Sequence, residues 1–220
     1  MTVDLVHLQR RASRADYRSM AALARALYQT GHHARGVLRT CYGVDFPDEL
    51  FAIADARARA RPPHVDFTNQ PWELAVPLVH GGPAPEPDGM DDIEQRVLAF
   101  DPQLFAVMAL LDPDSAHGHS VLCYRLDELA AGRSTVIGLR GFFYRDSVAS
   151  PERYGDSLLA VMLEHFTDHA RRRQRELASP ANRGAGAIDE GHAADARGGL
   201  ARVEEIVRHL TGGSGPDDAG

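Results

Sequence analysis

The residues of this chain that could do chemistry include two histidines spaced four apart, His165 and His169, in the segment EHFTDH. On a helix this spacing puts both imidazoles on one face, where they could hold a metal ion. The segment differs from the H-E-x-x-H zinc motif, because the acid between the two histidines, Asp168, does not follow the first one directly. The alternative is a partly buried histidine pair beside Phe166. We favour this alternative, so we expect no metal site and no cofactor.

The two cysteines, Cys41 and Cys123, are the other candidates for catalysis. Either thiol could act as a nucleophile if a histidine approached it in space. Cys123 lies in an apolar, strand-like run, where thiols are usually inert. Their spacing fits neither a disulfide framework nor a zinc knuckle, which favours reduced, buried thiols. His117 and His119 could ligate a metal or act as an acid and a base, but polar residues of a turn are the simpler interpretation.

An acidic stretch is the strongest candidate for a binding surface. One interpretation is an ordinary solvated surface. The functional interpretation is a negative patch that attracts a basic protein partner, such as a basic toxin domain. The candidate partner-binding residues are Glu86, Asp88, Asp91, Asp92 and Glu94, with Asp112 and Asp114 in a later turn. Trp72, the only tryptophan, is either a core residue or an interface anchor, and we favour the core.

Composition narrows the class of protein. The chain has 220 residues, of which 44% are hydrophobic and 25% charged, as in an ordinary globular protein. All 24 basic residues are arginine, the net charge is −7, and an acidic chain repels nucleic acid. No apolar run approaches the roughly 18 residues of a membrane span, and the first residues lack a secretory h-region. We therefore expect a cytoplasmic protein that binds neither nucleic acid nor a membrane.

Helices are expected to open the chain. The apolar spacing predicts an amphipathic helix over residues 14–31 and a shorter one over 33–40. The junction CYGVDFPDELFAI, residues 41–53, then ends one helix and begins another. We expect Gly43 to turn the chain with a positive φ and Pro47 to occupy the first turn of the next helix. The structural residues of this motif are Tyr42, Gly43, Pro47, Leu50 and Phe51.

Short strands are expected to follow. Apolar runs predict strands over 72–79, 120–125 and 134–140, while 104–111 is either a strand or a helix. The segment LDELAAG, between two of these strands, predicts a single helical turn. Residues 81–89 have the composition of a loop.

A helix should close the domain. Ser150 and Pro151 have the pattern of a helix start, and the helix should reach about Leu177. The expected organisation is a single domain over 1–178, a flexible linker over 179–199, and a short helix with a disordered tail over 200–220. The fold class is α+β, with N-terminal helices, a central and mainly antiparallel sheet of short strands, and a closing C-terminal helix.

Three stretches together resemble the SUKH superfamily, which includes Smi1/Knr4-like proteins and bacterial immunity proteins of polymorphic toxin systems. The first is the junction, with its glycine and its proline-initiated helix, from Tyr42 to Phe51. The second is FDPQLFAVMALLDPDSAHGHSVLCYR, residues 100–125, and the third spans Ser147 to Phe166. The resemblance covers roughly residues 14–170. It implies an α+β fold and protein binding without catalysis, and it provides no catalytic residue.

Three functional hypotheses remain open. The first is a non-catalytic, cytoplasmic protein-binding module, an immunity protein that neutralises a toxin by occlusion. The second is a metal- or thiol-dependent hydrolase that uses His165 and His169, or Cys123. The third is a SUKH-like regulatory scaffold without a toxin partner.

Overall fold

A computed structural model describes residues 4–57, 65–111, 119–142, 150–178 and 186–212. Its centre is a five-stranded antiparallel sheet in the order β1-β2-β3-β4-β5, so each strand pairs with its neighbours in sequence. Mixed helix and antiparallel sheet confirm the α+β prediction. The strands are β1 (Val65–Phe67), β2 (Leu104–Leu110), β3 (Ser120–Arg125), β4 (Val136–Arg140) and β5 (Pro151–Gly155).

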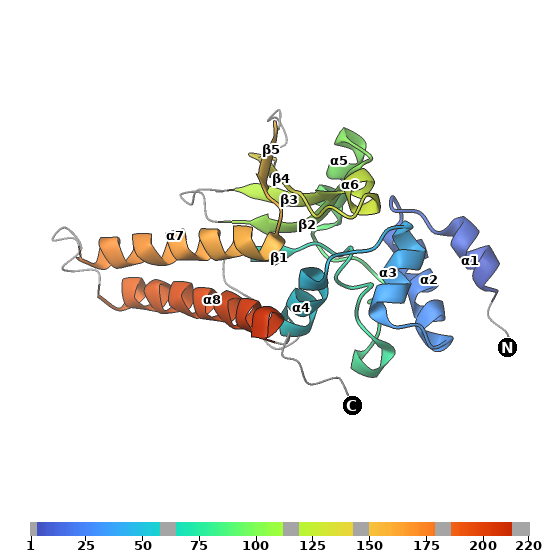
Figure 1. The fold of residues 1–220 in the computed structure, drawn as a ribbon, viewed down its shortest axis with the longest axis horizontal. Helices are drawn as coiled ribbons and strands as arrows, with labels where there is room; N and C mark the ends of the chain where they lie inside the picture. Colours follow the sequence, from blue (N-terminus) through green and yellow to red (C-terminus); the bar gives the residue numbers. More distant parts are fainter. Residues whose placement is uncertain (1–3, 58–64, 112–118, 143–149, 179–185, 213–220) are drawn as a thin grey trace.

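The helices gather at the two ends of the molecule and against the sheet (Figure 1). Helices α1 to α3 lie at one end. Helices α7 and α8 run side by side and extend beyond the sheet at the other end, with α4 between the two groups. The helices are α1 (Leu5–Arg11), α2 (Tyr17–Gln29), α3 (Ala34–Tyr42), α4 (Asp48–Arg57), η1 (Leu78–His80, a 3-10 turn), α5 (Asp91–Phe100), α6 (Leu126–Ala130), α7 (Leu158–Ala178) and α8 (Gly186–Gly212).

The sheet is covered on both faces, which explains the continuous apolar run of β2. All seven residues of this strand are buried. Side chains such as Phe105 and Val107 join the main core with α2, α3, α4 and α7, while Leu104 and Ala106 join a smaller core that includes Val97 of α5. A strand buried on both faces shows no alternation of polar and apolar residues, so periodicity alone could not separate it from a helix.

The segment that begins at Ser150 is not a helix start, which corrects the sequence prediction. Residues Pro151–Gly155 form β5, an edge strand that pairs with β4. Proline is tolerated at the first position of an edge strand, so the Ser-Pro pattern is compatible with either element. The helix begins later, at Leu158, and the capping hydroxyl is that of Ser157, which accepts a hydrogen bond from the Ala160 N–H at 3.2 Å.

The predicted linker is also wrong from residue 186 onward, because α8 runs from Gly186 to Gly212. Alanine favours a helix, and the cost of each glycine, about 1 kcal/mol relative to alanine, can be offset by packing. Ala193 and Val203 are buried, and α8 packs along α7 and against α4. The helix expected at 200–210 is therefore the second half of a longer helix that docks on the domain.

The expected strand over 72–79 is instead a series of turns that ends in η1. The Gln70–Pro71 peptide bond is cis, and Trp72 is buried in the main core. Its indole N–H donates a hydrogen bond to the Val107 carbonyl. The preference for a core tryptophan is confirmed.

Candidate functional site

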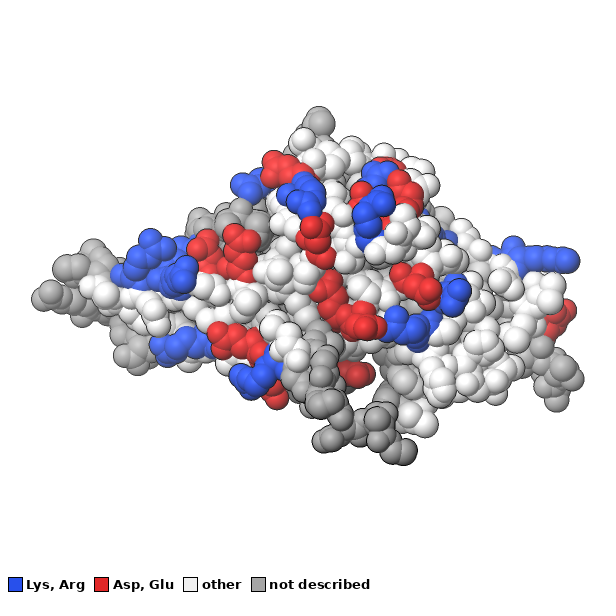
Figure 2. Space-filling view, in the orientation of Figure 1, with Lys and Arg blue, Asp and Glu red and all other residues white. Residues whose placement is uncertain are grey.

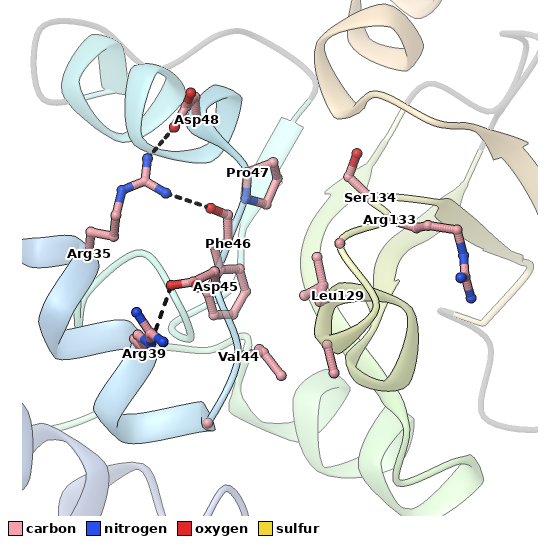
Figure 3. A pocket seen from close by; sticks show the side chains of 13 residues that line it. Arg35, Arg39, Val44, Asp45, Phe46, Pro47, Asp48, Leu129, Arg133 and Ser134 are labelled. Carbon is pink, nitrogen blue, oxygen red and sulfur yellow. Dashed lines mark hydrogen bonds and ion pairs between the residues drawn. The ribbon is translucent and has the colours of Figure 1, made fainter.

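An open hollow of about 520 Å³ lies where the α3–α4 junction faces the turn between α6 and β4 (Figure 3). This volume is within the range of roughly 300–1,000 Å³ that is typical of ligand sites. One wall is the junction and the other is the end of α6 with the residues that follow it. The lining residues are Arg35, Arg39, Gly43, Val44, Asp45, Phe46, Pro47 and Asp48 on the first wall, and Leu129, Ala130, Gly132, Arg133 and Ser134 on the second.

Gly43 shapes the first wall. It has the left-handed conformation, with φ of 74°, and its N–H donates to the Arg39 carbonyl at 2.8 Å. A residue without a Cβ adopts this conformation without steric cost, so the predicted turn is confirmed. The chain then runs through Val44 and Phe46, whose side chains are buried, to Pro47 just before α4. The same residues that suggested a tight junction therefore form a wall of the hollow.

Glu49, on the first turn of α4, fixes that wall to the rest of the domain. Its Oε1 accepts hydrogen bonds from the Tyr124 hydroxyl at 2.9 Å and from the Leu158 N–H at 2.7 Å. Its Oε2 accepts from the Ser157 hydroxyl at 2.5 Å and from the Leu159 N–H at 3.3 Å. Glu49 lies in the first turn of its own helix, but its carboxylate caps the N-terminus of α7.

Charged side chains of both signs stand at the rim of the hollow (Figure 3). Arg35 is held firmly: it pairs with Asp48, donates to the Phe46 carbonyl at 3.0 Å and lies 4.4 Å from the centre of the Phe51 ring. Arg39 is held loosely, since its only ion pair within the described chain is to Asp45 at 3.7 Å.

The main chain of the first wall has spare hydrogen-bonding capacity. Between Gly43 and Pro47 the backbone N–H groups of Val44, Asp45 and Phe46 donate to no acceptor in the described part of the protein. Backbone N–H groups need a hydrogen-bond partner, so these three remain available to water or to another molecule. No local pattern in the sequence indicated the hollow, because its opposite wall comes from residues more than eighty positions away.

The acidic stretch predicted as a patch is partly neutralised. The Arg18 guanidinium donates to the Glu86 carboxylate at 2.7 Å, and Arg96 lies 4.0 Å from Asp92. Asp88 is exposed and Asp91 is half-buried. Asp112 and Asp114 lie outside the described residues. On the face drawn in Figure 2, acidic and basic side chains are interspersed and form no large area of a single sign.

Glu94 is not a surface residue, which corrects its place in the predicted patch. Only 8% of it is exposed, and its Oε1 accepts hydrogen bonds from the N–H groups of Asn69 and Gln70, the latter at 3.4 Å. Burial raises the pKa of this carboxyl group to about 7, against the opposing effect of the Asn69 and Gln70 hydrogen bonds. Helical periodicity explains the error, because Glu94 lies three residues before Val97 and shares the buried face of α5 with it.

None of the candidate catalytic residues lines the hollow. His165 and His169 are 0% and 1% exposed, as expected for a buried pair. Among the described residues no three His, Cys, Asp or Glu side chains are grouped to hold a metal. Burial raises the pKa of the Cys41 thiol to about 12 and raises that of Cys123 further, which suppresses the reactive thiolate. His117 lies outside the described residues, and His119 precedes β3 with a positive φ.

Comparisons with protein-family models, with curated proteins and with solved structures each found no match to this chain. None of the described helices combines the length and the apolar character needed to cross a membrane.

Proposed function

We propose that this protein is a non-catalytic, cytoplasmic protein-binding module and that the hollow is its binding surface. The observation that carries the proposal is the run of unused N–H groups at Val44–Phe46, in the wall of a hollow whose rim is charged. Protein interfaces are enriched in arginine and combine apolar contacts with main-chain hydrogen bonds. Here the apolar part comes from Val44, Phe46 and Leu129, which are mostly buried, and the polar part from the rim.

The finer proposal is that the partner is a toxin and that binding neutralises it by occlusion. The support is that the junction, which carries the strongest part of the SUKH resemblance, is also one wall of the hollow. Gly43, Phe46, Pro47 and Asp48 belong to both. A rigid wall suits this mechanism, because a preformed surface loses little conformational entropy on binding.

The hydrolase hypotheses receive less support. A thiol whose pKa is raised by burial is a poor nucleophile at neutral pH. Within the described residues the histidine pair has no third His, Cys, Asp or Glu ligand beside it, whereas catalytic zinc usually has three protein ligands. A regulatory scaffold would use the same surface as an immunity protein, and only the partner distinguishes them.

Co-expression with the toxin-like product of an adjacent gene tests the proposal. We expect the two proteins to co-purify and the host cells to survive. The variant Ala130→Arg places a large side chain at an exposed position that lines the hollow, and it should abolish both effects. Ala131→Arg is the matched control, since Ala131 is exposed and adjacent but does not line the hollow, and it should behave like the wild type.

Two outcomes would refute the proposal in different ways. Equal binding by the Ala130→Arg and Ala131→Arg variants would remove the hollow as the binding surface. A complex that forms without protecting the cells would favour the regulatory scaffold over the immunity protein.

A further inference from the structure

We propose that the hollow takes an extended, acidic segment of the protein partner, held by main-chain hydrogen bonds to Val44–Phe46 and by the Arg39 guanidinium. This inference rests on the proposed function, since it concerns the same site. It adds the conformation and the charge of the segment that enters.

The extended conformation follows from the first wall. Main-chain recognition of this kind needs a partner whose own N–H and C=O groups are free, as they are in an extended strand and not in a helix. Val44, Asp45 and Phe46 offer three consecutive N–H groups that have no acceptor in the described chain. Pro47 has no N–H and α4 begins at Asp48, so the available run ends there.

The acidic character follows from the uneven use of the rim charges. Asp48 is paired with Arg35, and Asp45 has Arg39 nearby. Arg35 is already engaged by Asp48, by the Phe46 carbonyl and by the Phe51 ring. Arg39 is different, because its side chain is 69% exposed and its contact with Asp45 is 3.7 Å long. A carboxylate on the partner could accept two parallel hydrogen bonds from this guanidinium. This bidentate geometry is the strongest for such a pair.

Arg133, on the second wall, adds positive charge to the rim of the hollow. It forms no ion pair with any described residue, and Figure 3 shows its side chain directed away from the junction. The rim therefore has three arginines against two aspartates. We expect Arg133 to attract an acidic segment at a distance and Arg39 to contact it.

The experiment is selection of a displayed library of random dodecapeptides against the full chain, followed by synthesis of the enriched peptides and measurement of their affinity by fluorescence anisotropy. We expect enriched peptides to contain Asp or Glu. Arg39→Glu should weaken their binding by about tenfold or more, and Arg133→Glu by less. Arg10→Glu makes the same charge change on an exposed residue of α1 and should leave binding unchanged. Replacing backbone amides of the peptide with esters, whose carbonyl oxygens are weaker hydrogen-bond acceptors, should also weaken binding.

Several results would overturn the inference: no enriched peptide, enriched peptides without acidic residues, or equal effects of Arg39→Glu and Arg10→Glu. This inference and the proposed function can fail independently of each other. A toxin that is neutralised equally by the wild type and by Arg39→Glu, but not by Ala130→Arg, would leave the binding surface in place and refute the acidic segment. Peptides that bind as expected while no neighbouring toxin is neutralised would refute the immunity function alone.

Discussion

The Glu49 carboxylate accepts a hydrogen bond from the backbone N–H of Leu158 at 2.7 Å, across 109 positions of sequence. The same carboxylate also binds the hydroxyl groups of Ser157 and Tyr124. One side chain on α4 thus connects the first turn of α7 with the sheet. These hydrogen bonds hold the first turn of α4, which directly follows the wall of the hollow in sequence.

Replacing Glu49 with alanine should destabilise the fold. The N–H groups of Leu158 and Leu159 and the Tyr124 hydroxyl would lose their acceptor. A hydrogen bond to a charged group contributes about 1.5–3 kcal/mol to stability. We expect a loss of about 3 kcal/mol in the free energy of unfolding, measured by urea denaturation. The neighbouring Asp48→Ala is the control, because Asp48 is 82% exposed and its surface ion pair should contribute less than about 1 kcal/mol. Similar losses in both variants would contradict the role given to Glu49.

Gly43→Ala should also destabilise the protein, through backbone strain alone. The residue has φ of 74°, and no atom lies within 4 Å of where a Cβ would be placed. The left-handed conformation costs an L-residue about 1–2 kcal/mol, and we expect a loss of this size in thermal or urea denaturation. Gly89→Ala is the matched control, since its surroundings are equally open and its φ is not positive. A loss at Gly89 as large as that at Gly43 would contradict this explanation.

Local signals in the sequence were sufficient for much of the fold. The turn at Gly43, the helices before and after it, and the strands β3 and β4 follow from glycine placement and apolar periodicity. The start at Ser150 was misjudged because Ser-Pro suits both a helix start and an edge strand. Only pairing with β4 decides between them, and pairing is not a local property.

The site was harder to predict because it depends on residues far apart in the sequence. The motif from Tyr42 to Phe51 gave one wall, but nothing in it indicates that the α6–β4 turn lies opposite. The acidic run suggested a patch, yet Glu94 faces inward and Glu86 is paired with Arg18. Counting charges along a sequence does not show which of them remain available after folding.

Glu94→Gln should change how stability depends on pH. The folded protein holds the Glu94 pKa at about 7, above the ordinary value of 4.5, because the carboxyl group is buried and Asp91 is close. A raised pKa means that the folded state prefers the protonated form. The contribution of Glu94 to stability is therefore complete below about pH 4.5 and is lost as the pH rises through 7.

We expect the wild type to lose about 2 kcal/mol more than Glu94→Gln between pH 5 and pH 8, measured by urea denaturation at each pH. Glutamine is a suitable probe because its amide oxygen can still accept the hydrogen bonds of Asn69 and Gln70. Parallel pH profiles for the two proteins would show that Glu94 is ionised normally.

Zinc titration should separate the buried histidine pair from a metal site. His165 and His169 are joined by no third ligand among the described residues, so we expect the wild type and His165→Ala to take up zinc equally. Circular dichroism would check that the variant is folded, since it removes a buried side chain. One equivalent of zinc bound by the wild type and absent from the variant would contradict a purely structural role.

Hydrogen exchange in the presence and absence of a neutralised partner tests the central claim most directly. If the partner segment pairs with the first wall, the N–H groups of Val44, Asp45 and Phe46 should exchange rapidly in the free protein and slowly in the complex. The amides of Leu158 and Leu159, which are already bonded to Glu49, should change little. Protection that appears elsewhere while residues 44–46 exchange as rapidly as before would contradict the account.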